Sequence, residues 1–229
     1  MTGGRRVIVC DDELQILRAL KVILRDAGFD VIAAATAQEA LDAAAVQRPD
    51  AAILDLVLPD GDGVEVCRSI REWSAMPIIV LSAMGEEAQK IRALDAGADD
   101  YVTKPFSPGE LVARLNRALR RAGQAGAADE PVLSADGLEL DLAAHRVSVD
   151  GDEVHLTPIE FELLRTLMQG RGRLLTHRAL LAEVWGPGYE DDTQILRVHV
   201  ANLRRKIEPQ PGSPRYIVTD PGVGYRFAA

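Results

Sequence analysis

Short apolar runs alternate with amphipathic helical patterns through the first 121 residues, and this alternation constrains the fold more than any other feature. Five of the runs have the composition of buried strands: Val7–Cys10, Val31–Ala34, Ala51–Leu54, Ile78–Leu81 and Asp100–Val102. Four helical patterns lie between them and a fifth follows, so each crossover returns to the same sheet. This order predicts a doubly wound α/β domain with a five-stranded parallel sheet and helices on both faces.

A change in composition near residue 121 marks a domain boundary. From Ala122 to Pro131 the chain contains mostly small residues and has no hydrophobic periodicity, which is typical of a flexible linker. A length of 229 residues also fits two domains. We therefore predict a first domain over residues 1–121, a linker over 122–131 and a second domain over 132–229.

The second domain combines short strands, three helices and a terminal hairpin. Strands are predicted at Leu138–Asp141, Arg146–Val149, Glu153–Leu156, Tyr216–Thr219 and Tyr225–Phe227. Helices are predicted from about Thr157 to Met168, Thr176 to Trp185 and Thr193 to Ile207. This order predicts an α+β winged helix-turn-helix domain.

Charge is distributed unevenly along the chain. The net charge of −9 argues against nucleic-acid binding, but residues 193–229 carry six basic and only two acidic residues. Within Arg197–Lys206 there are four basic residues and no acid. A local excess of this kind is what phosphate contact requires, although a solvated charged face is the alternative.

The last predicted helix has two distinct faces. Residues at spacings of four, three and four form an apolar stripe: Leu196, Val200, Leu203 and Ile207. The opposite side carries small, polar and basic residues that are suited to a DNA major groove: Gln194, Val198, Ala201 and Arg205, flanked by Arg197, Asn202 and Arg204.

Chemically related residues follow the strands of the first domain. Asp11 and Asp12 follow the first strand, Asp55 follows the third, Ser82 the fourth and Lys104 the fifth. Ligands of open parallel sheets bind at this edge. Three carboxylates supply the oxygen ligands that Mg²⁺ prefers, and a lysine neutralises an anion. Each residue alone also fits a turn or a cap, but together they predict a phospho-acceptor site on Asp55.

The quoted residues resemble the receiver domain of two-component response regulators, which has a flavodoxin-like or CheY-like fold. The similar segments are Val7–Glu13, Ile53–Gly63, Ile79–Ala83 and Gly97–Phe106. The resemblance implies that a sensor histidine kinase phosphorylates Asp55, and that Asp11, Asp12, Asp55 and the Val57 carbonyl hold Mg²⁺. It also implies that Ser82 and Tyr101 are a switch pair, and that Lys104, before a cis bond to Pro105, contacts phosphate. Val57 and Met84 flank the site and predict slow loss of the phosphoryl group.

The second domain resembles the effector domain of the OmpR/PhoB subfamily through Leu156–Leu164 and Gly222–Phe227. This resemblance implies homodimerisation on activation through Arg92, Asp99, Asp100, Glu110, Arg114 and Arg121. It implies binding to a direct repeat in double-stranded DNA through Gln194, Arg197, Val198, Asn202, Arg204, Arg205, Lys206, Arg215 and Arg226. RNA polymerase is a further implied partner. Pro221 replaces the arginine that the subfamily usually carries in its wing.

Four further segments narrow the resemblance: Arg71–Ser74, Gln89–Tyr101, Arg197–Arg204 and Thr219–Tyr225. Within the subfamily, they look most like regulators of a high-affinity potassium pump. The expected function is therefore phosphorylation-controlled transcription regulation, without enzymatic activity of its own. One alternative is a DNA-binding regulator that does not need phosphorylation. A less favoured alternative is a phosphohydrolase with an aspartate nucleophile, which would need an insertion long enough to cap its substrate.

Apolar run length, the N-terminal pattern and the cysteine count predict where in the cell the protein is found. No apolar run reaches the roughly 20 residues of a membrane span, and the N-terminus lacks the pattern of a signal peptide. Two cysteines are too few for a disulfide framework. We expect a cytoplasmic protein without a membrane partner.

Overall fold

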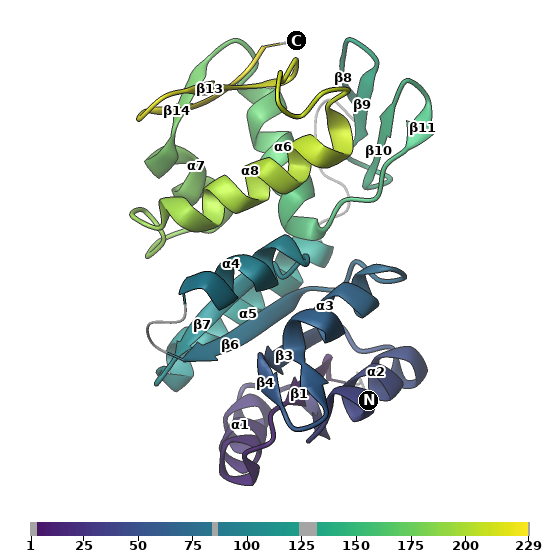
Figure 1. Cartoon of the computed structure of the whole chain (residues 1–229), viewed down its shortest axis with the longest axis vertical. Helices are drawn as coiled ribbons and strands as arrows, with labels where there is room; N and C mark the ends of the chain where they lie inside the picture. Colours follow the sequence, from purple (N-terminus) through teal and green to yellow (C-terminus); the bar gives the residue numbers. More distant parts are fainter. Residues whose placement is uncertain (1–3, 84–86, 124–131, 229) are drawn as a thin grey trace. The chain divides into compact units, whose positions relative to one another are not determined.

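The computed structural model describes residues 4–83, 87–123 and 132–228. The chain forms two compact units, Met1–Arg120 and Arg121–Ala229, here called the N-terminal unit and the C-terminal unit (Figure 1). The linker expected over 122–131 lies mostly outside the described residues.

The N-terminal unit is built on a parallel sheet with the strand order β2-β1-β3-β6-β7 (Figure 1). The strands are β1 (Arg6–Cys10), β2 (Asp30–Ala34), β3 (Ala51–Asp55), β6 (Ile78–Ala83) and β7 (Asp100–Lys104). The helices are α1 (Leu14–Asp26), α2 (Ala37–Gln47), α3 (Gly63–Arg71), α4 (Glu87–Asp95) and α5 (Pro108–Gly123). The predicted doubly wound fold is confirmed. The short antiparallel pair β4 (Val57–Leu58) and β5 (Gly61–Asp62) was not predicted.

The central strands are apolar because both faces of the sheet are covered. Strands β3 and β6 have buried side chains on both faces, apart from Ala83 at the end of β6. On one face, the α1 residue Leu20 and the α5 residue Leu111 pack in a cluster with Val9 and Ile53. This packing fixes the sheet edge from which the polar strand-end residues project.

The C-terminal unit has two antiparallel sheets and three helices. One sheet contains β8 (Val132–Ala135), β9 (Leu138–Asp141), β10 (Arg146–Val149) and β11 (Asp152–Glu153). The other contains β12 (Leu174–Thr176), β14 (Gly224–Phe227) and β13 (Ile217–Asp220), in that order. The helices are α6 (Pro158–Gln169), α7 (His177–Val184) and α8 (Thr193–Ile207), giving a winged-helix domain in which β13 and β14 form the wing.

Some details of the C-terminal unit differ from the sequence prediction. The strands β8 and β12 were missed, and the strand expected at Glu153–Leu156 is wrong because regular pairing ends at Glu153. The following residues lead into α6, and Thr157 and Glu160 form a capping box at its N-terminus. The apolar stripe predicted on α8 is confirmed, since Leu196, Val200 and Leu203 are all buried.

No helix of the described ranges is long and apolar enough to cross a membrane.

Candidate functional site

Three carboxylates meet at the carboxyl edge of the N-terminal sheet. Asp11 and Asp12 follow β1, and Asp55 ends the neighbouring strand β3, which pairs with β1 in parallel register. One carboxylate oxygen from each of the three side chains lies within 4.8 Å of the others. Asp11 and Asp55 are buried, whereas Asp12 is exposed.

Lys104 provides the positive charge of this group. Its Nζ donates to Asp11 Oδ2 and Asp55 Oδ2, at 2.7 Å in each case. Burial alone would lower the pKa of Lys104, but the hydrogen bonds to both carboxylates outweigh burial and raise it. Burial also raises the pKa of Asp11, although the bonds from Lys104 and the Glu13 backbone oppose this change. The peptide bond between Lys104 and Pro105 is cis, as the resemblance implies.

The backbone around Asp55 is closely packed. Asp55 Oδ1 accepts from the Val57 N–H at 3.3 Å, and the Asp55 side chain is 12% exposed. A Cβ atom on Gly63 would lie 2.0 Å from the Asp55 carbonyl oxygen. Gly63 therefore shapes the site although it contributes no side chain. The sequence shows this glycine only as the last residue of the Ile53–Gly63 segment and predicts no role for it.

Ser82 and Tyr101 lie on adjacent strands. The Ser82 side chain is buried, and its Oγ has no hydrogen-bond partner within the described ranges. Tyr101 is half-buried, with the Lys90 Nζ 4.9 Å from the centre of its ring. Of the two flanking positions, Val57 is 60% exposed, and Met84 lies outside the described residues.

This donor set suits a magnesium ion. The three carboxylates supply hard oxygen ligands at one sheet edge, and an exposed Asp12 leaves room for coordinated water. Asp11, Asp12, Asp55 and the Val57 carbonyl would hold the ion. The unpartnered Ser82 hydroxyl is a donor available to an anion bound there.

Two acidic residues expected at a dimer interface have partners within the N-terminal unit. Asp99 is 2% exposed, and its Oδ2 accepts from Arg71 Nη2 at 2.7 Å and from the Ile78 N–H at 2.8 Å. Asp100 is also buried and pairs with Arg114 at 3.1 Å. Burial of these carboxylates requires such partners, and the expected dimer contacts of Asp99 and Asp100 stay a prediction.

The remaining residues of the expected interface vary in exposure. Arg92 is exposed and pairs with Asp62 at 2.8 Å, and exposed Glu110 pairs with Arg114 at 2.8 Å. Arg121 is buried. The expected dimer contacts of Arg92, Glu110 and Arg121 stay a prediction.

The residues expected to contact DNA differ in exposure. Arg197 and Arg205 on α8 are exposed, and Gln194 is half-buried. Val198 and Asn202 are 7% and 5% exposed. The Asn202 Oδ1 accepts from Arg205 Nη2 one turn away. An i, i+3 contact of this kind competes with base recognition by Asn202.

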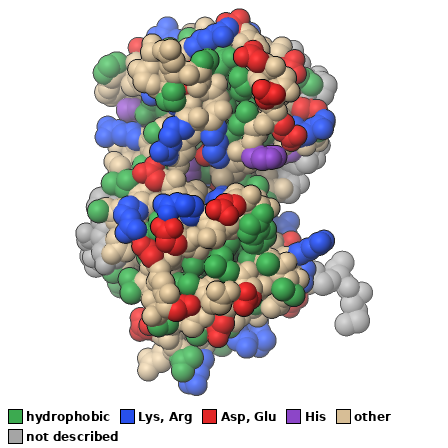
Figure 2. Space-filling view, turned by 45° about the vertical axis from the view of Figure 1, so that its right-hand side comes forward, with side chains coloured by type: hydrophobic (Ala, Val, Ile, Leu, Met, Phe, Trp, Pro, Cys, Tyr) green, Lys and Arg blue, Asp and Glu red, His purple; other side chains and the backbone are tan. Residues whose placement is uncertain are grey.

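The other basic residues of this group have internal partners. Arg204 binds Ile217 and Thr219, Lys206 Nζ lies 2.7 Å from Glu160 Oε2, and both interactions are inside the C-terminal unit. Arg215 pairs with Asp136 and Arg226 with Asp220, each at 3.1 Å. Figure 2 correspondingly shows basic and acidic side chains interspersed over the visible face. Pro221 is exposed between β13 and β14.

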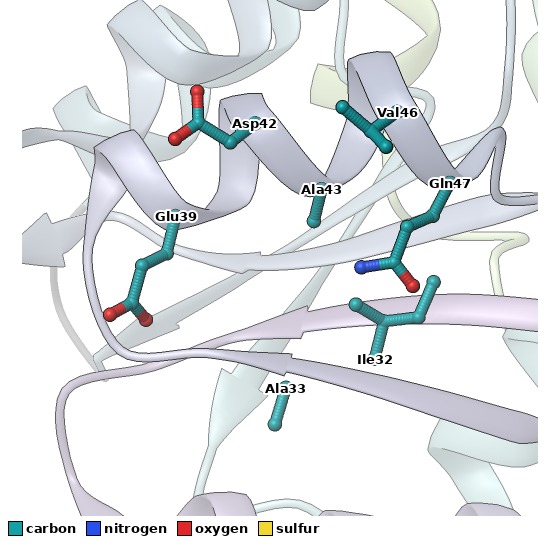
Figure 3. Close-up of a pocket in the computed structure, with 7 residues that line it drawn as sticks. All are labelled: Ile32, Ala33, Glu39, Asp42, Ala43, Val46 and Gln47. Atoms are coloured by element: carbon teal, nitrogen blue, oxygen red, sulfur yellow. The ribbon is translucent and has the colours of Figure 1, made fainter.

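A groove between β2 and α2 contains none of the predicted site residues. Figure 3 shows its lining, with polar side chains contributed by α2 and apolar ones by both elements: Ile32, Ala33, Glu39, Asp42, Ala43, Val46 and Gln47.

Comparison with known proteins identifies both units. Residues 7–116 match the model for the response regulator receiver domain, and residues 151–227 match the model for the C-terminal domain of transcriptional regulatory proteins. The chain therefore belongs to the response regulators of two-component systems, in the OmpR/PhoB type with a winged-helix DNA-binding domain. This family implies a histidine kinase partner and DNA binding.

Within this class the chain is similar to the transcriptional regulatory protein KdpE. The identity is 50% over 223 residues with KdpE of Mycobacterium tuberculosis, covering 97% of this chain and 99% of the relative. It is 49% over 221 residues with KdpE of Escherichia coli K12, covering 96% and 98%. The crystal structure of DrrB, an OmpR/PhoB homologue from Thermotoga maritima, matches with a TM-score of 0.52 and 31% identity over 99% of this chain and 100% of that chain. The chain is thus a KdpE-like transcription regulator rather than the phosphohydrolase considered as an alternative.

Proposed function

We propose that Asp55 is the sole phospho-acceptor of this regulator and that a sensor histidine kinase supplies the phosphoryl group. The observation that carries the proposal is the convergence of Asp11, Asp12 and Lys104 on the Asp55 carboxylate. In the transfer, an Asp55 Oδ bonds to phosphorus as the bond from phosphorus to the kinase histidine nitrogen breaks. The imidazole of the kinase histidine is the leaving group, and the transfer needs no oxidant or reductant.

Charge compensation is the main requirement of this step. Bound Mg²⁺ would supply positive charge to the phosphoryl oxygens. Lys104 holds a second positive charge at Asp55, and its Nζ can move from the free carboxylate to a phosphoryl oxygen. The buried Ser82 hydroxyl supplies a neutral donor on the neighbouring strand β6.

Phosphate mapping tests the acceptor. The full chain is incubated with acetyl phosphate and MgCl₂, and the acyl phosphate is located by mass spectrometry under conditions that preserve it. We expect one phosphoryl group on Asp55 and none after Asp55→Asn. Glu65→Gln, which changes an exposed acid on α3, is the matched control and should be phosphorylated normally. Stable phosphorylation of Asp55→Asn would overturn the assignment.

The effect of the phosphoryl group on assembly is a second part of the proposal. Contact of Ser82 with a phosphoryl oxygen and reorientation of Tyr101 favour homodimerisation through α4, β7 and α5. Exposed Arg92 and Glu110 are the pair best placed to meet a second copy, since Asp99 is committed to Arg71. Glu110→Lys should weaken the phosphorylated dimer in sedimentation, and adding Arg92→Glu should partly restore it. Absence of coupling would contradict this pairing.

For DNA, we propose that α8 enters a major groove and that two copies bind a direct repeat. Exposed Arg197 and Arg205 are the basic side chains of α8 best placed for guanine or phosphate. RNA polymerase is the partner through which bound regulator would act, and a Kdp-type potassium-uptake operon is the proposed target. Genome-wide footprints with and without phosphodonor test the direct repeat and the target operon. Equal footprints under the two conditions would favour the phosphorylation-independent regulator.

A further inference from the structure

The end of helix α8 is joined to the first wing strand through a buried carboxylate. Glu208 follows the last residue of α8 and is 7% exposed. Its Oε1 accepts from the Tyr216 and Ile217 N–H groups at 2.9 and 2.8 Å. Its Oε2 accepts from the Arg215 N–H at 2.7 Å. A buried carboxylate is costly without partners, and these three N–H groups provide them.

Arg204 binds oxygen atoms of the same strand, whereas Glu208 binds its N–H groups. Its Nε donates to the Ile217 carbonyl oxygen at 3.0 Å, and its Nη2 donates to that oxygen and, at 2.8 Å, to Thr219 Oγ1. The guanidinium carbon also lies 5.7 Å from the centre of the Tyr225 ring on β14. Both wing strands are therefore in contact with this one side chain.

The two residues form a matched pair at the end of the helix. Glu208 caps α8 four positions after Arg204, and its N–H donates to the Arg204 carbonyl oxygen at 2.9 Å. Ile217 gives its N–H to Glu208 and its carbonyl oxygen to Arg204. A displacement of β13 relative to α8 would break bonds to both charged groups, so this strand and helix are held as one body.

We propose that Arg204 and Glu208 are positioning residues for DNA binding: they fix the β13–β14 wing relative to α8, so that helix and wing meet one duplex in a single geometry. Arg204 then acts through β13 and not through a phosphate, in contrast to the role expected from its place in the basic segment. The inference rests on the proposed function of α8 as the DNA-contacting helix.

Glu208→Gln gives a test in which electrostatics and positioning predict opposite signs. Loss of an acid next to DNA should strengthen binding through charge alone. Loss of one acceptor oxygen, and its replacement by an NH₂ group facing backbone N–H donors, should instead release β13. We expect affinity for a specific duplex to fall about tenfold, the effect of losing one hydrogen bond to a charged group. Glu139→Gln, at an exposed acid on β9, should leave it equal or slightly stronger.

Arg204→Lys separates positioning from phosphate contact. Lysine keeps the charge and can still contact a phosphate, but it lacks the planar fork that binds Ile217 and Thr219 together. We expect affinity for the specific duplex to fall about as much as for Glu208→Gln. The slope of log K against log salt should be unchanged for both Arg204→Lys and Arg204→Ala. Arg146→Lys, at an exposed arginine on β10 outside α8 and the wing, is the matched control and should leave the affinity unchanged.

The probe is a duplex that the wild-type full chain enriches from a random-sequence library, with a scrambled duplex as the non-specific reference. Amide hydrogen exchange tests whether release of β13 causes the loss of affinity. Protection should fall in Arg215–Thr219 in Glu208→Gln and Arg204→Lys, and it should stay constant in α6. Unchanged or tighter specific binding by Glu208→Gln would overturn the proposal. A slope lowered by about one for Arg204→Ala, with normal binding by Arg204→Lys, would make Arg204 a phosphate contact. Failure of the wild-type chain to enrich any duplex would count against the proposed function itself.

Discussion

The N-terminal unit takes its functional side chains from several strands that end at one sheet edge, whereas the C-terminal unit takes four of the six basic side chains expected to contact DNA from one helix. In the first case, Asp11, Asp55 and Lys104 are far apart in sequence but converge because β1, β3 and β7 belong to the same parallel sheet. In the second, Arg204 and Arg205 are neighbours in sequence but differ in environment: Arg204 binds the wing, and Arg205 is exposed.

This difference separates topology from local pairing. Topology alone brings the strand-end residues together, so few alternative placements exist for them. A helical residue is placed on a face by its periodicity, but its partner comes from another segment. The partners of Arg204 and Lys206 are on β13 and α6, and neither is determined by the sequence of α8.

The largest expected effects come from one glycine in each unit. A Cβ on Gly63 would lie 2.0 Å from the Asp55 carbonyl oxygen, and one on Gly224 would lie 1.9 Å from the Leu175 carbonyl oxygen. Gly63→Ala and Gly224→Ala should each lower the free energy of unfolding of their own unit by about 4 kcal/mol or more, because backbone must move in both cases.

Denaturant unfolding and phosphorylation together compare the two glycine variants. Gly63→Ala should also impair phosphorylation of Asp55, and Gly224→Ala should leave it normal. Gly109→Ala and Gly212→Ala are the controls, because a Cβ at either position meets no atom within 4 Å. Impaired phosphorylation in Gly224→Ala would break the comparison between independently organised units.

A buried ion pair in the N-terminal unit should give the next largest effect. The side chains of Arg71 and Asp99 are 11% and 3% exposed, and Asp99→Ala leaves the arginine without its charge partner. We expect the free energy of unfolding to fall by about 3 kcal/mol. Glu65→Ala, which breaks an exposed pair with Arg68, is the control and should produce no measurable change. A dimerisation defect in Asp99→Ala without loss of stability would restore Asp99 to the interface.

Sequence reasoning predicts the fold of the N-terminal unit and the convergence of its site well, for a physical reason. Buried strands such as Ala51–Asp55 are continuous apolar runs, and their ends are marked by the change to polar residues. It fails where short segments pair: β8 and β12 have no strong periodicity, and their positions depend on the strands beside them. It also does not predict the intrachain partner of Asp99, which is Arg71, 28 positions away in the chain. Neither pattern nor charge counting identifies such a partner.

Helix capping should give a smaller effect that differs between the units. In the N-terminal unit, Thr36 Oγ1 accepts from the Glu39 N–H, while the Glu39 carboxylate binds the Ala35 N–H. In the C-terminal unit, Thr157 and Glu160 form a reciprocal capping box, and Glu160 also binds Lys206. Replacement of either threonine by alanine should cost about 1 kcal/mol, with the larger loss at Thr157. Thermal unfolding measures both, and serine variants should retain most of the stability. A larger loss of stability in Thr36→Ala than in Thr157→Ala would contradict the expectation that the buried capping box of Thr157 stabilises its helix more.

The smallest expected effect is a dependence on pH confined to the C-terminal unit. All four histidines of the chain lie there, at positions 145, 155, 177 and 199. His145 stacks on Phe161 with ring centres 3.6 Å apart, and burial lowers the pKa of His145, with Arg165 adding to the decrease and Glu162 opposing it. The unfolded chain therefore binds more protons than the folded one just below the ordinary histidine pKa of about 6.5. The stabilising contribution of neutral His145 is fully present above that pH and is lost as the pH falls toward the lowered pKa.

Urea unfolding between pH 7 and 5 measures this change through buried Trp185, in a Trp73→Phe background that removes the exposed tryptophan. His145→Asn keeps a residue suited to the left-handed backbone at this position and should flatten the dependence, whereas His155→Asn, at an exposed histidine, should not. An unchanged pH profile in His145→Asn would show that another group of the C-terminal unit is responsible.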